Sequence, residues 1–345
     1  MGHRFTQLGL LGGVCAVALA VSGCAMVKNK AINSLGDTLA QGTSTFATDE
    51  DPELIRDATP FALKTIEILI QQSPKHRGLL LAACSGFTQY SYGFVQQEAD
   101  FTEAQNLDRA TEMRERARKL YLRALGYGMR AFETEFPGFR DRLRQDPDRE
   151  LARLSRKHVP LLYWTGASWA AAFSINKADA ELSADQGLIE KLMRRALALD
   201  ETWGKGAIHD FFITWEGGRS SVGGSLDRAR EHFERAKQLA AGLRAAPLVT
   251  YAEVVSVGTQ NRKEFVQLLN EALKVDVDKA PDERLANILA ERRARWLLGR
   301  ADELFVDPGQ AAGTGRWPST LRRAQGRPEL SRGTTGSGHP ERVEG

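Results

Sequence analysis

The sequence of 345 residues predicts an all-α fold, and three observations lead to this prediction. Apolar residues recur at steps of three and four through most of residues 51–306. Charged residues fill the positions between them, and no alternating apolar run of strand length interrupts the pattern. We therefore expect a body built from helices over residues 51–306.

The helix over residues 225–242 has the clearest boundaries. Ser225 is a favourable N-cap, and Gly242 is a favourable terminator. Its apolar face holds Leu226, Ala229, Phe233, Ala236 and Ala240. Charged residues between these positions predict a solvent-facing side, so this is an amphipathic helix packed on a core.

Other helices also carry boundary signals. Asn261 with Glu264 matches the spacing of a capping box, and Ser183 with Gln186 approximates it. A last helix is expected to carry the apolar residues Leu285, Ile288, Leu289, Trp296, Ala301, Leu304 and Phe305.

Four of these helices end alike, each with an alanine after polar or charged residues. The alanines are Ala124, Ala196, Ala236 and Ala272, separated by 72, 40 and 36 positions. The first gap is twice the last, and the last is close to the period of about 34 residues in tetratricopeptide repeats. We therefore expect a tetratricopeptide-like helical repeat bundle or solenoid. The alternative is chance similarity between alanine-rich helices, and the Trp/Gly/Tyr consensus is missing.

The N-terminus has the layout of a secretory signal over residues 1–23. A basic start containing Arg4 precedes 14 uncharged residues, 8–21. A helix of that length spans about 21 Å, which is short of the roughly 30 Å of a bilayer core. The segment is therefore expected to be removed rather than to stay as a membrane span.

Val21-Ser22-Gly23-Cys24 resembles the bacterial lipobox. The resemblance implies that Cys24 is acylated and that residues 24–50 form a lipidated tether. Ala25 stands where many inner-membrane lipoproteins have Asp, so the resemblance indicates lipid anchoring in the outer membrane, facing the periplasm. The alternative is an ordinary signal with an incidental thiol.

The charge balance argues against nucleic acid as a partner. Arg4 is the only charged residue before Cys24, and residues 307–345 hold six basic and four acidic side chains. Residues 24–306 therefore carry 40 side chains of each sign, without the excess of basic side chains that binds a nucleic-acid backbone.

Cys84 is the one cysteine left for the folded body, and its apolar surroundings favour core packing.

Four ordered segments resemble the T-component (TatT) family associated with TRAP transporters. They are Pro60-Phe61-Ala62-Leu63 to Gln72-Ser73-Pro74, residues 163–169, the glycine-rich loop 217–224 leading into residues 229–233, and residues 296–305. The resemblance covers roughly residues 24–306, and no single segment is diagnostic.

The resemblance implies a lipoprotein with a tetratricopeptide-like body that forms a homotrimer. It also implies binding to the periplasmic solute-binding subunit of a TRAP transporter and handling of a small hydrophobic or carboxylate-bearing ligand. No catalytic residue and no cofactor come with it.

Aromatic-rich helices are the candidate ligand site, because tyrosine and tryptophan combine an apolar body with a polar tip. The expected ligand-binding residues are Tyr90, Tyr92, Tyr163, Trp164, Trp169, His209 and Phe212. For any single residue, packing between helices is the alternative.

No pattern of an enzyme or a metal site is visible. The histidines after the signal are dispersed, at positions 76, 158, 209, 232 and 339, and no cysteine pair has zinc spacing. The loop 217–224 lacks the Lys-Ser/Thr ending of a phosphate-binding loop, so it is interpreted as a turn between helices.

Residues 307–345 contain eight glycines and four prolines with few aliphatic residues, which is typical of a disordered tail. Taken together, the sequence predicts a periplasm-facing accessory of solute uptake. The alternative is a helical-repeat scaffold lipoprotein for outer-membrane or pilus assembly.

Overall fold

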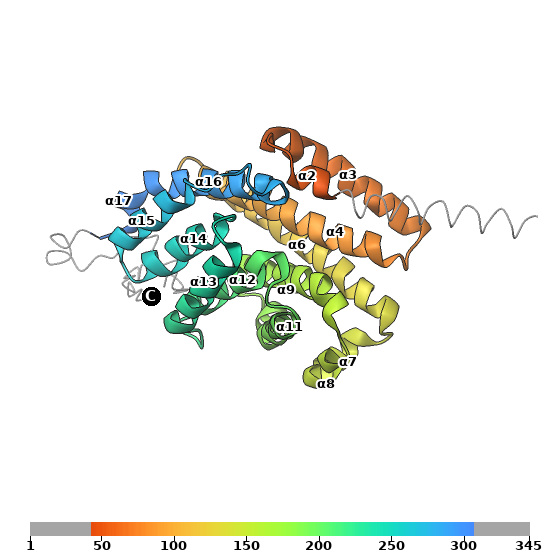
Figure 1. Cartoon of the computed structure of the whole chain (residues 1–345). Coiled ribbons are helices and arrows are strands. Elements are labelled where there is room, and N and C mark those ends of the chain that lie inside the picture. Colours follow the sequence, from red (N-terminus) through yellow and green to blue (C-terminus); the bar gives the residue numbers. More distant parts are fainter. Residues whose placement is uncertain (1–42, 307–345) are drawn as a thin grey trace, which may run out of the picture.

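The computed structural model describes residues 43–306, and every regular element within this range is a helix (Figure 1). The predicted all-α fold is therefore confirmed. The signal peptide, Cys24 and the tail from residue 307 lie outside the described residues, as does most of the expected tether. None of the helices described between residues 43 and 306 has both the length and the apolarity of a membrane span.

The first half of the body is a row of long helices in which α3 packs on α4, α4 on α6 and α6 on α9. Its elements are α2 (Thr43–Ala47), α3 (Pro52–Gln72), α4 (Arg77–Tyr90), η1 (Ser91–Gln96), α5 (Gln97–Thr102), α6 (Leu107–Glu135), α7 (Phe139–Gln145), α8 (Pro147–Ala152), η2 (Arg156–His158) and α9 (Val159–Ile175).

The second half continues the row through α11, α12, α13 and α14 to α16. Its elements are α10 (Ala180–Ala184), α11 (Gln186–Leu199), η3 (Trp203–Gly206), α12 (Ala207–Gly217), α13 (Leu226–Ala240), α14 (Ala246–Tyr251), η4 (Ala252–Ser256), α15 (Arg262–Ala272), η5 (Pro281–Glu283), α16 (Arg284–Gly299) and α17 (Ala301–Leu304).

The row of helices closes on itself, because α16 returns to α2 and α3 (Figure 1). Arg284 on α16 donates a hydrogen bond to the carbonyl oxygen of Thr48 over 3.0 Å. Further along α16, the ring of Trp296 packs against Phe101 with centroids 5.2 Å apart. The helix contacts of residues 43–306 thus form a closed ring.

The apolar core has two parts that meet in α12. The larger part runs from Ile55 to Trp215, and the smaller runs from Ile213 to Phe305. The alanines that end four of the helices are all fully buried. Their burial fits close packing between helices, but the tetratricopeptide-like repeat itself stays a prediction.

Two of the predicted helix starts are confirmed. The Ser225 hydroxyl accepts a hydrogen bond from the Arg228 amide at 3.2 Å, and α13 begins directly after it. Asn261 caps α15 in the same way, through the Glu264 amide. The carboxylate of Glu264 accepts instead from the Ser256 hydroxyl at 2.8 Å, so the second half of that capping box is absent.

Two other predictions of helix boundaries were wrong. Ser183 lies inside α10 and donates its hydroxyl to the Lys177 carbonyl, while Asp185 precedes α11. The expected last helix is divided, because α16 ends at Gly299 and α17 begins at Ala301. Glycine weakens a helix at this point, and the Arg300 amide bonds back only three residues, to Leu297.

Two short π-helical segments, η1 and η4, interrupt the helical rows. Such segments widen the helix by one residue and are frequent at functional sites. Tyr92 lies on η1, and Glu253 lies on η4.

Candidate ligand-binding site

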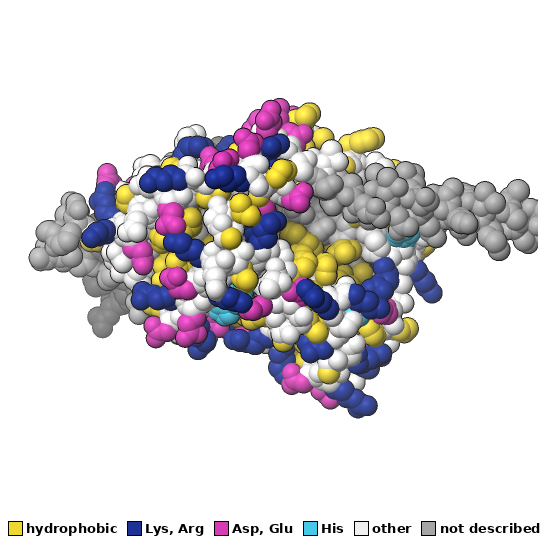
Figure 2. All heavy atoms as spheres, in the orientation of Figure 1, with side chains coloured by type: hydrophobic (Ala, Val, Ile, Leu, Met, Phe, Trp, Pro, Cys, Tyr) yellow, Lys and Arg dark blue, Asp and Glu magenta, His cyan; other side chains and the backbone are white. Residues whose placement is uncertain are grey.

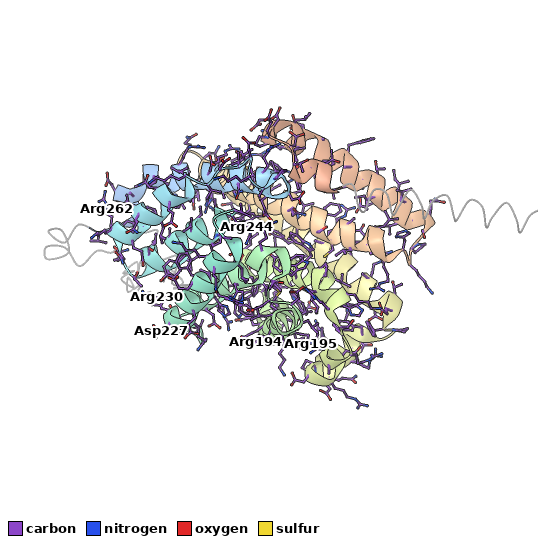
Figure 3. The ribbon with its side chains drawn as sticks, viewed as in Figure 1. Arg194, Arg195, Asp227, Arg230, Arg244 and Arg262 are labelled. Carbon is purple, nitrogen blue, oxygen red and sulfur yellow. The ribbon has the colours of Figure 1, made fainter. Side chains whose placement is uncertain are left out.

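Arg244 lies near the middle of the molecule, on the loop between α13 and α14 (Figure 3). Its Nη2 is 2.6 Å from Oδ2 of Asp210 on α12, and its Nε donates to Glu283 over 3.3 Å. Its Nη1 donates to the carbonyl oxygen of Lys205 over 3.2 Å. All three donor groups of the guanidinium are therefore engaged with the protein.

The charges around Arg244 are balanced. Lys205 also pairs with Glu283, at 3.0 Å, so the two cations of this group face Asp210 and Glu283. Burial raises the pKa of Asp210, and the neighbouring Arg244 offsets part of that rise. A buried, neutral ion group of this kind leaves no spare positive charge for an anionic ligand.

Three aromatic side chains lie close to this ion group. The Tyr163 ring on α9 is 4.6 Å from the Trp203 ring and 4.9 Å from the Trp164 ring, measured between centroids. All three side chains are half-buried. Burial raises the pKa of the Tyr163 phenol, and the charge of Asp210 raises it further.

Tyr92 on η1 is an accessible aromatic side chain. It is 51% exposed, and desolvation by the surrounding protein still raises the pKa of its phenol, which the charge of Arg293 partly offsets. Tyr92 also contributes to the raised pKa of Tyr163, after burial, Asp210 and Arg244. Figure 2 shows apolar side chains recessed near the middle of one face, inside a charged rim.

We call this group the central site. It consists of Tyr92, Tyr163, Trp164, Trp203, Asp210 and Arg244. The aromatic faces offer apolar contact, and the phenols offer hydrogen bonds, which suits a small molecule with an apolar body.

His209 precedes Asp210 on α12, and its side chain belongs to a second polar group. Its Nδ1 is 2.8 Å from Nδ1 of His232 on α13, and its Nε2 is 3.4 Å from Glu201. One imidazole must donate to the other, so at least one nitrogen of the pair stays deprotonated. Burial lowers the pKa of both histidines, that of His232 to about 4, with His209 as the next cause.

The remaining predicted ligand residues lie in the apolar core. Trp169 and Phe212 are buried, and Phe212 stacks on the His232 ring at 4.8 Å. Tyr90 is buried at the end of α4, where its hydroxyl accepts a hydrogen bond from Arg116 over 3.3 Å. The structure thus brings Tyr92, Tyr163 and Trp164 to the central site and His209 to a neighbouring group. Ligand binding by any of them stays a prediction.

Sequence reasoning missed Trp203, Arg244 and His232. Trp203 stands in a turn that continues through Lys205, whose φ of 51° is left-handed. Arg244 follows α13, which ends at Ala240, and nothing in the local sequence indicates that Arg244 is buried. Only the fold brings these residues inward, so periodicity along single helices could not identify them.

Other chemistry is not visible in the described part of the chain. Residues 43–306 contain no group of three or more histidine, cysteine or acidic side chains that could hold a metal ion. Cys84 is a free, fully buried cysteine, and burial raises the pKa of its thiol to about 12. It therefore has no thiolate character at neutral pH.

The glycine-rich loop between α12 and α13 is a tightly packed turn. The Gly224 amide donates to the Arg219 carbonyl over 2.9 Å, and Arg228 donates to the Gly223 carbonyl over 3.0 Å. A Cβ on Gly224 would lie 2.1 Å from the backbone oxygen of Glu216, so only glycine fits.

Comparison with known proteins matches the chain to a protein family and to a relative. A family model described as "TRAP transporter T-component" matches residues 48–305. A protein of Treponema pallidum (strain Nichols), named "Uncharacterized protein", is 31% identical over 317 residues; the match covers 85% of this chain and 98% of that protein.

Proposed function

The chain belongs to the TRAP transporter T-component family and is thus an accessory component of a TRAP transporter; from this premise we propose that it binds the periplasmic solute-binding subunit and handles a small ligand at the central site. The family match runs through almost all of residues 43–306, so the ring as a whole is the family's body. The family is a transport family, and the proposed role is binding without a chemical step.

The observation that supports a ligand is the group of half-buried aromatic rings of Tyr163, Trp164 and Trp203 beside the ion group of Arg244. Tyr92 is 51% exposed, so its phenol is accessible to a ligand. We propose that an apolar molecule with a hydrogen-bonding group binds here.

The charge of the central site favours a hydrophobic ligand over a carboxylate. Arg244 acts on Tyr163 and Arg293 acts on Tyr92, and both cations already pair with carboxylates of the protein, as does Lys205. A carboxylate ligand would have to compete with Asp210 or Glu283 for these partners, at the cost of leaving one of them buried and unpaired.

We also propose that acylated Cys24 holds the ring at the outer membrane, where a diffusing periplasmic subunit can reach it. The lipobox supports this anchor. The homotrimer stays a prediction that depends on the resemblance to the family.

Affinity capture tests the proposed partner. The full chain, expressed in its own host with a C-terminal tag, is cross-linked in cells and purified from membranes, and the recovered proteins are identified by mass spectrometry. We expect a periplasmic solute-binding protein, enriched over a control lipoprotein that carries the same residues 1–42 on an unrelated body. Recovery of β-barrel or pilus components in its place would contradict the proposal and favour the assembly scaffold.

A further inference from the structure

A cavity opens to the surface between α3 and α6, apart from the central site. Its volume is about 240 Å³, and its lining includes Lys64, Glu67 and Gln71 from α3 and Arg123, Tyr127 and Arg130 from α6. None of these residues belongs to the central site. Pockets for drug-sized molecules typically measure about 300–1,000 Å³, so this cavity fits a small polar group rather than a larger molecule.

Glu67 is the acidic residue of this cavity, and its carboxylate joins α3 to α6. Lys64 donates a hydrogen bond to its Oε2 over 2.7 Å, and the Tyr127 hydroxyl donates to its Oε1 over 2.6 Å. Nη2 of Arg123 lies 2.5 Å from the same Oε1. Burial raises the pKa of Glu67, but these partners more than offset that rise and hold the pKa below its usual value. The carboxylate is therefore charged at neutral pH.

The cavity keeps an excess of positive charge. Lys64, Arg123 and Arg130 bring three positive charges and Glu67 brings one negative charge, so the formal net charge of the lining is +2. Arg130 forms no ion pair with a carboxylate of residues 43–306. The next acid along α6, Glu133, accepts instead from two backbone amides at the start of α7. The central site differs, because there two cations face two carboxylates.

Aromatic rings hold the two arginines in position. The guanidinium of Arg123 lies over the Phe87 ring, 5.0 Å from its centroid, and that of Arg130 lies over the Tyr127 ring at 5.5 Å. The two rings stack on each other, with centroids 6.0 Å apart. An arginine that lies over a ring keeps N–H groups in its own plane for the oxygens of an anion. Because these donors are already placed, binding loses less side-chain entropy.

We propose that this cavity binds the phosphate group of a phosphate monoester. Such a group carries about −1.5 to −2 charges at neutral pH, which matches the excess of positive charge, whereas a carboxylate would neutralise half of it. Arginine binds phosphate oxygens through paired N–H groups, and lysine binds them as a point charge. A soluble phosphate ester and the headgroup of phosphatidic acid share this chemistry. The inference rests on α3 and α6 alone, so it is independent of the ligand and the partner proposed above.

Isothermal titration calorimetry tests the site on the full chain, purified in a mild non-ionic detergent at neutral pH and low ionic strength. The probes are glycerol 3-phosphate, dihexanoyl phosphatidic acid and, as the carboxylate control, acetate. We expect saturable binding of one phosphate group per chain. Binding of glycerol 3-phosphate would identify a soluble ester as sufficient, and binding of the lipid alone would identify a headgroup. Absence of saturable binding of both, or equally tight binding of acetate, would overturn the proposal.

Arg130→Gln is the first variant. Because Arg130 is exposed and has no carboxylate partner in the described body, its loss should leave the melting temperature nearly unchanged. We expect phosphate binding to weaken about tenfold or more. Arg116→Gln is the matched control, since Arg116 lies on the same helix over the Tyr90 ring at 5.8 Å but does not line the cavity. Equal weakening by both variants would show general attraction to a basic helix and overturn the proposal.

Glu67→Gln should change the affinity in the opposite direction. The substitution removes the carboxylate that competes for Lys64 and Arg123, so these cations become free to bind phosphate. We expect tighter binding than in the unmodified chain, which damage to the fold would not produce. Circular dichroism confirms that the variant is folded. Weaker or unchanged binding in a folded Glu67→Gln chain would overturn the proposal, and the comparison of Arg130→Gln with Arg116→Gln decides it if that chain does not fold.

Discussion

Arg293 on α16 donates a hydrogen bond to Asp100 on α5 across 2.9 Å, although 193 positions separate the two residues. Arg293 is only 8% exposed, and it also pairs with Glu253 on η4. One guanidinium therefore joins α16 to α5 in the first half of the chain and to η4 in the second. This contact closes the ring around the central site.

Loss of the closing cation should destabilise the fold. We expect Arg293→Met to lower the free energy of unfolding by about 1–3 kcal/mol, because the half-buried Glu253 would lose its partner and Asp100 would keep only Arg114. The control is Arg292→Met on the same helix, whose more exposed pair with Glu98 is worth about 0–1 kcal/mol. Urea unfolding measures both, and equal losses would show that the contact does not close the ring.

The histidine pair should make stability depend on pH. The folded pKa of His232 is about 4, below its ordinary value near 6.5, because burial and His209 disfavour a second charge. As the pH falls below about 6.5, the unfolded chain takes up a proton that the folded chain excludes until about pH 4, so stability is lost across this window. Melting temperatures at pH 7, 6 and 5 should fall in that order, and the fall should be smaller in His232→Gln. An identical fall in the variant would mean that other groups cause it.

The turn before α13 should not tolerate a side chain at Gly224. A Cβ there would lie 2.1 Å from the Glu216 backbone oxygen, so Gly224→Ala must displace the backbone. We expect a loss of about 1–3 kcal/mol in thermal or urea unfolding. Gly187→Ala is the control, because nothing lies within 4 Å of a Cβ at that position in α11 and alanine favours helix. A stable Gly224→Ala protein would contradict the packing of this loop.

Sequence patterns predicted the helix starts that depend only on neighbouring residues. Ser225 and Asn261 cap their helices because a side chain three residues away from an amide can bond to it in any fold. The break at Gly299 was missed, because the apolar period continues through it into α17.

The central site was predicted only in part, for a physical reason. Tyr163 and Trp169 both lie on the inward side of helices, and both satisfy the same apolar periodicity. Tyr163 is half-buried beside the charges of Asp210 and Arg244, whereas Trp169 is buried in the core. Which outcome holds depends on contacts such as that of Arg293 with Asp100, and these join segments far apart in the chain.

The central claim is that the closed ring holds a ligand at the central site. Native mass spectrometry tests it on the full chain purified in mild detergent without denaturation, alongside Tyr163→Ala/Trp164→Ala and a control with Val222→Ala. We expect a small molecule bound to the unmodified chain and to the control, and strongly reduced occupancy in the double variant at an unchanged fold by circular dichroism. A chain that carries no small molecule, or equal occupancy in all three proteins, would contradict the claim.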